Sequence, residues 1–348
     1  AKALRNQGIR KIDGAVVADM TILDTEAQNP AWLCEDAGNY YAPGIFGLNY
    51  YGNTMNIVLQ SGEPGTIAKV VRTEPQVEGL YFINHVRCDK IAYDGAFVSG
   101  MPFSRERYLS GAVPSKLGVF GVKGDLPNPG LLLAQHFTRV LREVGITVTQ
   151  EPSYEADYNP LTPPRQIVYT HYSPSLSELI KETNINSNNL YAEALFRLLG
   201  TRYTLPGTIH NSQEILRDYW RRRGVNIQNA IIKDGCGLAP QDAISARSLV
   251  QLLTIMSASK HAKQWIESLP ISGQTGTLKT LCASTPLEGR IYAKSGTIAG
   301  TKNFAGYIYL PNGEKWAFAI LINSAPGKAK NIQNVIQQYL LHVYQANQ

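Results

Sequence analysis

The stretch Arg290-Ile-Tyr-Ala-Lys-Ser-Gly-Thr297 begins the part of the chain that decides the fold. Its alternating residues predict a strand, and two similar stretches follow at 303–310 and 315–323. Pro311-Asn312-Gly313 between these two is typical of a hairpin turn. An amphipathic helix pattern comes next, at 328–344. We therefore predict three consecutive antiparallel strands with this helix packed on one face of the sheet.

The rest of the chain divides into a strand-rich first half and a helical second half. Up to about residue 160, short alternating stretches are separated by Gly and Pro turns, with one helix pattern at 129–144. A polar, proline-rich connector at 155–165 marks the boundary. Four helix patterns follow, at 175–183, 188–199, 212–223 and 245–256. The chain is 348 residues long, which predicts more than one domain.

The composition argues against several classes of protein. The net charge is +6, but the main basic cluster, Trp220-Arg-Arg-Arg223, is typical of a charged helix end, so we predict no nucleic-acid partner. No apolar run approaches the roughly 18 residues of a membrane span. The four cysteines have neither CxxC nor His-paired spacing, and there is no glycine-rich phosphate loop. We therefore predict no metal or nucleotide cofactor and no disulfide framework.

Lys294-Ser295-Gly296-Thr297 carries groups suited to an anionic ligand. In an extended strand, Lys294 and Gly296 face one side and the two hydroxyls face the other, unless the strand bends. Gly296 would let a second backbone approach the strand edge. The hydroxyls of Ser295 and Thr297 could bind a carboxylate while Lys294 provides a positive field. Taken alone, however, this tetrapeptide is more typical of an ordinary polar strand edge.

Ser187-Asn188-Asn189 precedes the helix pattern that contains Leu190. Ser and Asn are favoured helix N-caps, so the tripeptide alone indicates a cap. The tripeptide can also be interpreted as part of a catalytic site. Ser187 would relay a proton to a leaving amine, and Asn189 would orient a substrate carbonyl.

Four blocks, in order, resemble one protein family: Asn184-Ile-Asn-Ser-Asn-Asn-Leu-Tyr-Ala-Glu193, Asp234-Gly-Cys-Gly-Leu238, Gly276-Thr-Leu278 and Ala293-Lys-Ser-Gly-Thr297. The family is the DacB-type D-alanyl-D-alanine carboxypeptidase/endopeptidases, which are class C low-molecular-mass penicillin-binding proteins. Gly8-Ile-Arg-Lys-Ile-Asp-Gly14 and Asp36-Ala-Gly-Asn-Tyr-Tyr-Ala-Pro43 resemble its inserted domains, so the resemblance covers nearly the whole chain. Cys236 replaces the family's serine, a change that we interpret as one small side chain packing in place of another.

The resemblance implies an α+β multidomain fold. A penicillin-binding, serine β-lactamase-like domain, with an antiparallel sheet and helices, is combined with mainly β inserted domains. We expect residues 164–348 to form the penicillin-binding domain, without its N-terminal part. Residues 1–60 and 118–163 would form part of the first inserted domain, and 61–117 a second domain nested in it.

The resemblance also implies an activity. A serine-type D-Ala-D-Ala carboxypeptidase or endopeptidase would act on peptidoglycan stem peptides through an acyl-serine intermediate, in the periplasm or elsewhere outside the cytoplasm. β-Lactam antibiotics would acylate the same serine. The implied catalytic residues are Ser187 and Lys294, and the implied substrate-binding residues are Asn189, Ser295, Gly296, Thr297 and Asp36. Asp36 would contact the free amine of the stem peptide, with Glu35 as its rival and an ordinary exposed turn carboxylate as the alternative.

The family's nucleophile, in a Ser-x-x-Lys motif, is expected before these blocks. The one match here, Ser257-Ala-Ser-Lys260, follows Ser187 and ends a predicted helix, where the helix dipole would not assist a serine alkoxide. We interpret it as chance. Residues 1–8 resemble the end of a helix closed by Gly8, so we expect the nucleophile and any signal peptide to lie upstream of Ala1.

The polypeptide as written is therefore expected neither to hydrolyse D-Ala-D-Ala peptides nor to react with penicillin. The main alternative is a non-catalytic peptidoglycan-binding protein that keeps the cleft and has lost the nucleophile. An esterase or β-lactamase on the same scaffold is a weaker alternative, because small soluble substrates need no large inserted domains. The preference between carboxypeptidase and endopeptidase activity, the stem-peptide residue recognised and the oligomeric state stay open.

Overall fold

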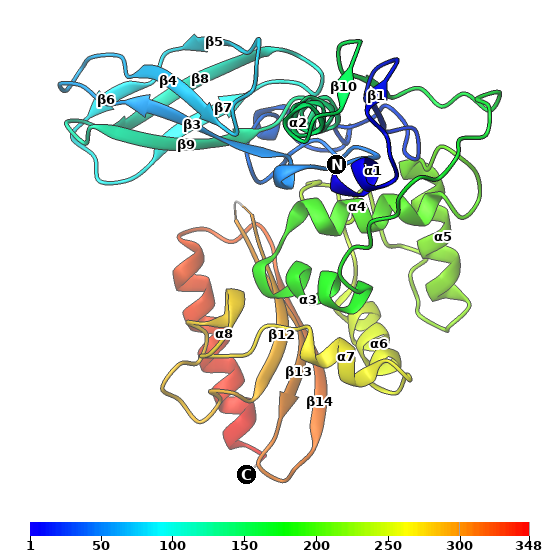
Figure 1. Ribbon diagram of the computed structural model, residues 1–348. Helices are drawn as coiled ribbons and strands as arrows, with labels where there is room; N and C mark the ends of the chain where they lie inside the picture. The colour runs from blue at the N-terminus through cyan, green and yellow to red at the C-terminus, as the bar shows by residue number, and fades with distance from the viewer. Residues whose placement is uncertain (299, 348) are drawn as a thin grey trace. The chain divides into compact units, whose positions relative to one another are not determined.

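The computed structural model describes every residue of the chain except 299 and 348 (Figure 1). The chain forms two compact units. Unit 1 comprises Ala1–Tyr172 and Glu193–Ser212, and unit 2 comprises Ser173–Ala192 and Gln213–Gln348. Each unit is therefore built from two separate segments of the chain.

The core of unit 2 is the antiparallel sheet that the sequence predicts. Its strands are β12 (Ile291–Ile298), β13 (Thr301–Tyr309) and β14 (Lys315–Ile322), in the order β12-β13-β14. Each strand is antiparallel to its neighbour in the chain. The predicted order and direction of the strands are confirmed.

Helix α8 (Ala329–Gln345) covers one face of this sheet (Figure 1). Its buried residues recur every four positions, and this spacing places them on one side of the helix. They are Ile332, Ile336, Leu340 and Tyr344. They share a hydrophobic cluster with Ile291, Phe304 and Ile308 of the sheet. The predicted packing of the closing helix is confirmed.

Helices α6 (Ala246–Ser257) and α7 (Ala262–Glu267) cover the opposite face. Buried Tyr307 ties both helices to the sheet, because its hydroxyl donates to the Leu253 carbonyl at 2.6 Å and accepts from Trp265 Nε1 at 3.0 Å. Burial raises the pKa of Tyr307 to about 12, so this phenol stays a neutral hydrogen-bonding group. The sheet is thus held between two helical layers.

Three longer helices and a short 3-10 helix lie wholly or partly in unit 2. They are α3 (Leu176–Asn186), α4 (Asn189–Gly200), α5 (Ile209–Arg221) and η3 (Gly276–Leu278). Helix α3 begins after Ser175, whose hydroxyl accepts from the backbone N–H of Glu178 while Glu178 accepts from the Ser175 N–H. This reciprocal cap explains why the predicted helix starts where it does.

Unit 1 contains two sheets over one core. The first has the order β4-β3-β9, from β3 (Thr54–Gln60), β4 (Lys69–Glu74) and β9 (Val119–Asp125). The second consists of β5 (Tyr81–Asn84), β6 (Arg87–Asp89), β7 (Gly95–Ser99) and β8 (Glu106–Pro114). Buried residues of both sheets form a single hydrophobic cluster. The core around the expected nested domain, 61–117, therefore extends into β3 and β9.

The remainder of unit 1 differs from the mostly β expectation. It contains two short parallel strand pairs, β1 (Lys11–Ile12) with β10 (Thr147–Val148) and β2 (Val17–Asp19) with β11 (Ser153–Glu155). In each pair one strand precedes α2 (Pro129–Glu143) in the chain and the other follows it. The short helices are α1 (Lys2–Asn6), η1 (Cys34–Asp36) and η2 (Tyr51–Asn53). Helix α2 matches the helix pattern at 129–144, but strands of two or three residues are too short to produce a periodic sequence pattern, so the parallel pairs were not predicted.

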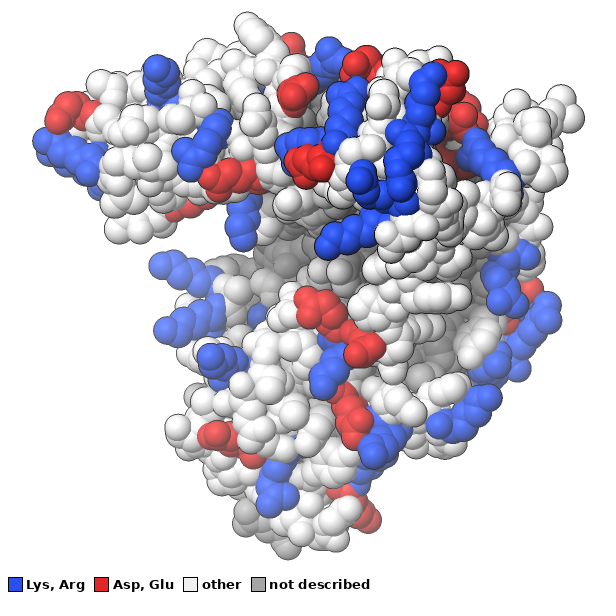
Figure 2. All heavy atoms as spheres, in the orientation of Figure 1, with Lys and Arg blue, Asp and Glu red and all other residues white. Residues whose placement is uncertain are grey.

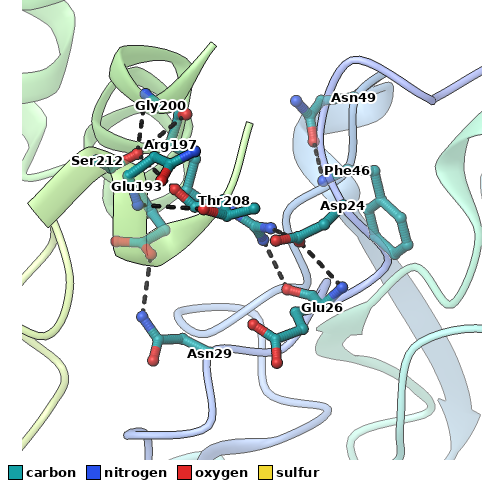
Figure 3. Close-up of polar contacts among 11 residues, drawn as sticks. Asp24, Glu26, Asn29, Phe46, Asn49, Glu193, Arg197, Gly200, Thr208 and Ser212 are labelled. Carbon is teal, nitrogen blue, oxygen red and sulfur yellow. Dashed lines mark hydrogen bonds and ion pairs between the residues drawn. The ribbon is translucent and has the colours of Figure 1, made fainter. Parts of the chain in front are cut away.

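The segment Glu193–Ser212 is tied into unit 1 by buried polar contacts (Figure 3). Arg197 donates to the carbonyl of Glu26 at 2.6 Å and forms an ion pair with Asp24. Glu193 accepts a hydrogen bond of 3.2 Å from Asn29 Nδ2. Because both buried charged side chains belong to α4, these contacts fix the second half of that helix within the unit.

Basic and acidic side chains are interspersed on the face drawn in Figure 2. Within the described part of the chain, no helix combines the length and the apolar character that a bilayer span requires.

Candidate active site

Ser187 and Lys294, predicted as a catalytic pair, meet in unit 2. Lys294 Nζ donates to Ser187 Oγ at 2.8 Å, although 107 residues separate the two positions. The same ammonium donates to the backbone carbonyl of Ser295 at 2.6 Å. Burial, with a smaller contribution from the charge of Lys302, lowers the pKa of Lys294 to about 8. Two residues from different family blocks therefore meet in unit 2, and their catalytic roles stay predictions.

The corner between α3 and α4 aims Ser187 at the lysine. Ser187 has φ 55° and ψ 49°, in the left-handed region that a non-glycine residue adopts at a cost of roughly 1 kcal/mol or more. The cap of α4 is instead Asn188, whose Oδ1 accepts from the Tyr191 N–H at 3.1 Å. Because Asn188 performs the capping, the Ser187 hydroxyl is available to Lys294. Asn189, the first residue of α4, lies in the same unit, and its predicted role stays a prediction.

The two hydroxyls of the β12 motif are held by residues that the sequence did not single out for the site. Ser295 Oγ lies 2.8 Å from Thr277 Oγ1 of η3. Thr297 Oγ1 accepts from Lys302 Nζ at 2.8 Å. Thr277 belongs to one of the four family blocks, but nothing in that block indicated the contact with Ser295. The register that places Lys302 opposite Thr297 was not predicted, because Lys302 lies before the predicted strand 303–310.

The outer edge of β12 is open beside this motif. Among the described residues, the segment 270–272 pairs with β12 up to Ala293 and no further, and the Ala293 N–H donates to the Pro270 carbonyl at 3.0 Å. Further along, Gly296 is exposed, and a Cβ placed there would have Asn303 Cβ as its nearest neighbour, at 3.9 Å. The fold itself therefore has room for a side chain at this position. The glycine leaves that space to a ligand backbone that approaches the edge.

Gly276 brings η3 against α3 and so positions Thr277. Its φ is +55°, and a Cβ there would lie 2.3 Å from the Ile185 carbonyl oxygen. Gly276→Ala is therefore expected to lower the free energy of unfolding by at least about 2 kcal/mol, through overpacking and backbone strain together. Urea unfolding measures this change. Gly313→Ala is the control, because Gly313 has φ +88° but nothing within 4 Å of its Cβ position. Equal losses in the two variants would contradict the steric explanation.

Asp36, the predicted contact for the stem-peptide amine, lies in η1 of unit 1. Its carboxylate accepts from the Tyr41 hydroxyl at 2.7 Å. Burial and this hydrogen bond raise the pKa of Tyr41. The rival Glu35 is exposed. The role of Asp36 stays a prediction, since the other candidate residues belong to unit 2.

Two remaining motifs have ordinary structural partners. Ser257 ends α6 and donates to the Thr254 carbonyl at 3.0 Å, while Lys260 is exposed, as expected for a chance Ser-x-x-Lys match. In the Asp-Gly-Cys-Gly-Leu block, Asp234 accepts from backbone N–H groups of its own loop, at 2.6 Å from Gly237 and 2.8 Å from Ala239. Cys236 Sγ lies 3.6 Å from the same carboxylate, so the thiol occupies a weak donor position.

Helices cover both faces of the sheet, and a lysine on its edge strand contacts a serine at the corner between two helices. This arrangement is that of the penicillin-binding, serine β-lactamase-like class. The profile of the D-Ala-D-Ala carboxypeptidase 3 (S13) family matches residues 1–343, and the chain belongs to that family. The family and the fold class predicted from the sequence are both confirmed.

Individual relatives agree with this assignment. The D-alanyl-D-alanine carboxypeptidase DacB of Haemophilus influenzae is 25% identical over 338 residues, which cover 92% of this chain and 67% of that protein. A D-alanyl-D-alanine carboxypeptidase of an Actinomadura species is 26% identical over 339 residues, or 92% of this chain and 62% of that protein. The crystal structure of penicillin binding protein 4 (dacB) from H. influenzae matches with a TM-score of 0.85 and 22% identity, covering 99% of this chain and 77% of that one.

Proposed function

We propose that this protein is a serine-type D-Ala-D-Ala carboxypeptidase. It removes the terminal D-Ala of peptidoglycan stem peptides through an acyl-serine intermediate, and β-lactams acylate the same serine. The observation that carries this proposal is the 2.8 Å contact between Lys294 Nζ and Ser187 Oγ beside an open strand edge. Cleavage of the D-Ala to diamino-acid cross-link is the finer activity that we propose with it.

The geometry supports a separate role in the reaction for each side chain of the candidate site. Because Ser187 Oγ accepts from the ammonium of Lys294, it can take a proton from Lys294 while it gives its own hydroxyl hydrogen to the leaving amine nitrogen as the peptide C–N bond breaks. The lowered pKa of Lys294, about 8, keeps proton exchange with Ser187 accessible near neutral pH. Ser295 and Thr297 bind the terminal carboxylate, and Asn189 orients the reacting carbonyl.

The wider organisation belongs to the same proposal. Residues 164–348 are proposed as the penicillin-binding domain, with 1–60 and 118–163 as part of one inserted domain and 61–117 as a domain nested in it. Asp36 in η1 is proposed to contact the amine of the stem peptide. The proposed location is outside the cytoplasm, where peptidoglycan lies.

Two assays on the protein expressed from its whole gene test this function. Fluorescent penicillin is expected to label the protein covalently, with unlabelled penicillin preventing the reaction. D-Ala is expected to be released from an acylated peptide that ends in D-Ala-D-Ala, but not from its L-Ala-L-Ala counterpart. A protein that binds the peptide yet neither labels nor releases D-Ala would contradict the proposal and favour a non-catalytic peptidoglycan-binding role.

A further inference from the structure

We propose that Lys302 is a positioning residue of this site, which orients the Thr297 hydroxyl and makes the subsite selective for a peptide that ends in a free carboxylate. This inference rests on the proposed function, because it concerns the carboxylate subsite of the same reaction. Lys302 lies outside the Lys-Ser-Gly-Thr motif, on the neighbouring strand.

Strand register places Lys302 at the motif. It is the direct cross-strand partner of Thr297 in the antiparallel pair of β12 and β13. Its ammonium lies 5.2 Å from the centre of the Phe304 ring, and Phe304 is buried in the core of the sheet. The lysine is thus held at both its backbone and its ammonium group, on regular secondary structure.

The hydrogen bond from Lys302 sets the direction of the Thr297 hydroxyl. Lys302 Nζ donates to Thr297 Oγ1 at 2.8 Å, so a lone pair of the hydroxyl oxygen faces the lysine. A hydroxyl has one hydrogen to donate, and here that hydrogen must point away from the ammonium. Thr297 is therefore prepared to donate to an anion at the strand edge, and a side chain without a donor at position 302 would leave its orientation undetermined.

Two lysine charges lie at this strand edge without acidic partners. Among the described residues, neither Lys294 nor Lys302 forms an ion pair with a carboxylate. Burial lowers the pKa of both ammonium groups, and the charge of Lys302 also lowers that of Lys294. A bound carboxylate would relieve the repulsion between them, whereas a neutral carboxamide would not.

Equilibrium binding measures this selectivity without requiring acylation. Isothermal titration of the polypeptide of residues 1–348, which is expected not to hydrolyse the peptide, compares at pH 7 a peptide ending in D-Ala-D-Ala carboxylate with its C-terminal carboxamide. Lys302→Met is expected to weaken carboxylate binding about tenfold, as for the loss of one charge-assisted partner, with little change for the carboxamide. Lys302→Arg should retain most of the selectivity. Lys315→Met is the matched control, because Lys315 also lies over an aromatic ring, 5.3 Å from Tyr307, and pairs with Tyr309 at the other end of the sheet.

The pH dependence provides a readout that a merely structural role would not change. Carboxylate binding should weaken as pH rises through the pKa of Lys294, near 8 in the unaltered protein. Removing the charge of Lys302 raises that pKa, so the midpoint should move to higher pH in Lys302→Met.

Two results would overturn the inference: equal weakening of both peptides in Lys302→Met, or an unchanged pH midpoint. If the protein expressed from its whole gene is not labelled by penicillin, but peptide binding still depends on Lys302, only the proposed function would be contradicted. The two failures are therefore distinguishable.

Discussion

Replacing Lys294 with alanine is expected to slow acylation by penicillin by on the order of 10²-fold or more, as for the loss of one preorganised electrostatic group. Lys294 Nζ contacts Ser187 Oγ at 2.8 Å, and β12 holds the cation at that point. The measurement is the time course of fluorescent penicillin labelling by the protein expressed from its whole gene. Release of D-Ala from a D-Ala-D-Ala peptide should slow in parallel.

A double-mutant cycle separates this role from a general effect on the fold. Residues that act as a unit lose most of their effect with the first substitution, so Ser187→Ala with Lys294→Ala should be little slower than the slower single variant. The thermal midpoint of Lys294→Ala should not fall, because removing a partly buried ammonium relieves desolvation. Lys315→Ala is the control for a lysine elsewhere in the sheet. Strictly additive effects of Ser187 and Lys294 would refute their action as a pair.

Asp125→Ala is expected to lower the free energy of unfolding of unit 1 by about 3–5 kcal/mol. Asp125 accepts from Arg107 Nε at 2.9 Å, and the two side chains are 1% and 0% exposed. The variant would leave the Arg107 guanidinium buried without its counter-charge. Its remaining partners include the carbonyl of Glu106, at 2.8 Å, which cannot neutralise a charge. Urea-dependent hydrogen exchange of peptides from β3, β8 and β9 reports on this core.

Two further variants test the physical cause. Replacing both partners with apolar residues, Arg107→Met with Asp125→Leu, should cost much less than Asp125→Ala, because no uncompensated charge remains. Glu74→Ala breaks the exposed Arg72–Glu74 pair, whose side chains are 54% and 51% exposed, and should destabilise the protein much less than Asp125→Ala. A loss below 1 kcal/mol in Asp125→Ala would show that burial of the charge is not what makes this pair important.

The sequence by itself determined the elements that repeat a local pattern. The three-stranded sheet and α8 follow from alternation over eight or nine residues and from apolar residues four apart, as in Ile332 and Ile336. The start of α3 follows from Ser175 and Glu178, which are three positions apart. These features depend only on neighbours within a few turns or one hairpin, so a short stretch of residues contains all the information that they need.

Only the tertiary structure decided which side chains meet. The tripeptide 187–189 predicted both a cap and a catalytic serine, and the fold assigns the cap to Asn188 and turns the Ser187 hydroxyl to Lys294. Thr277 became part of the site because Gly276 lets η3 pack against the end of α3. The pairs β1–β10 and β2–β11 join strands of two or three residues from distant parts of the chain. Contacts of this kind are set by packing between elements and by strand register, and no local periodicity encodes them.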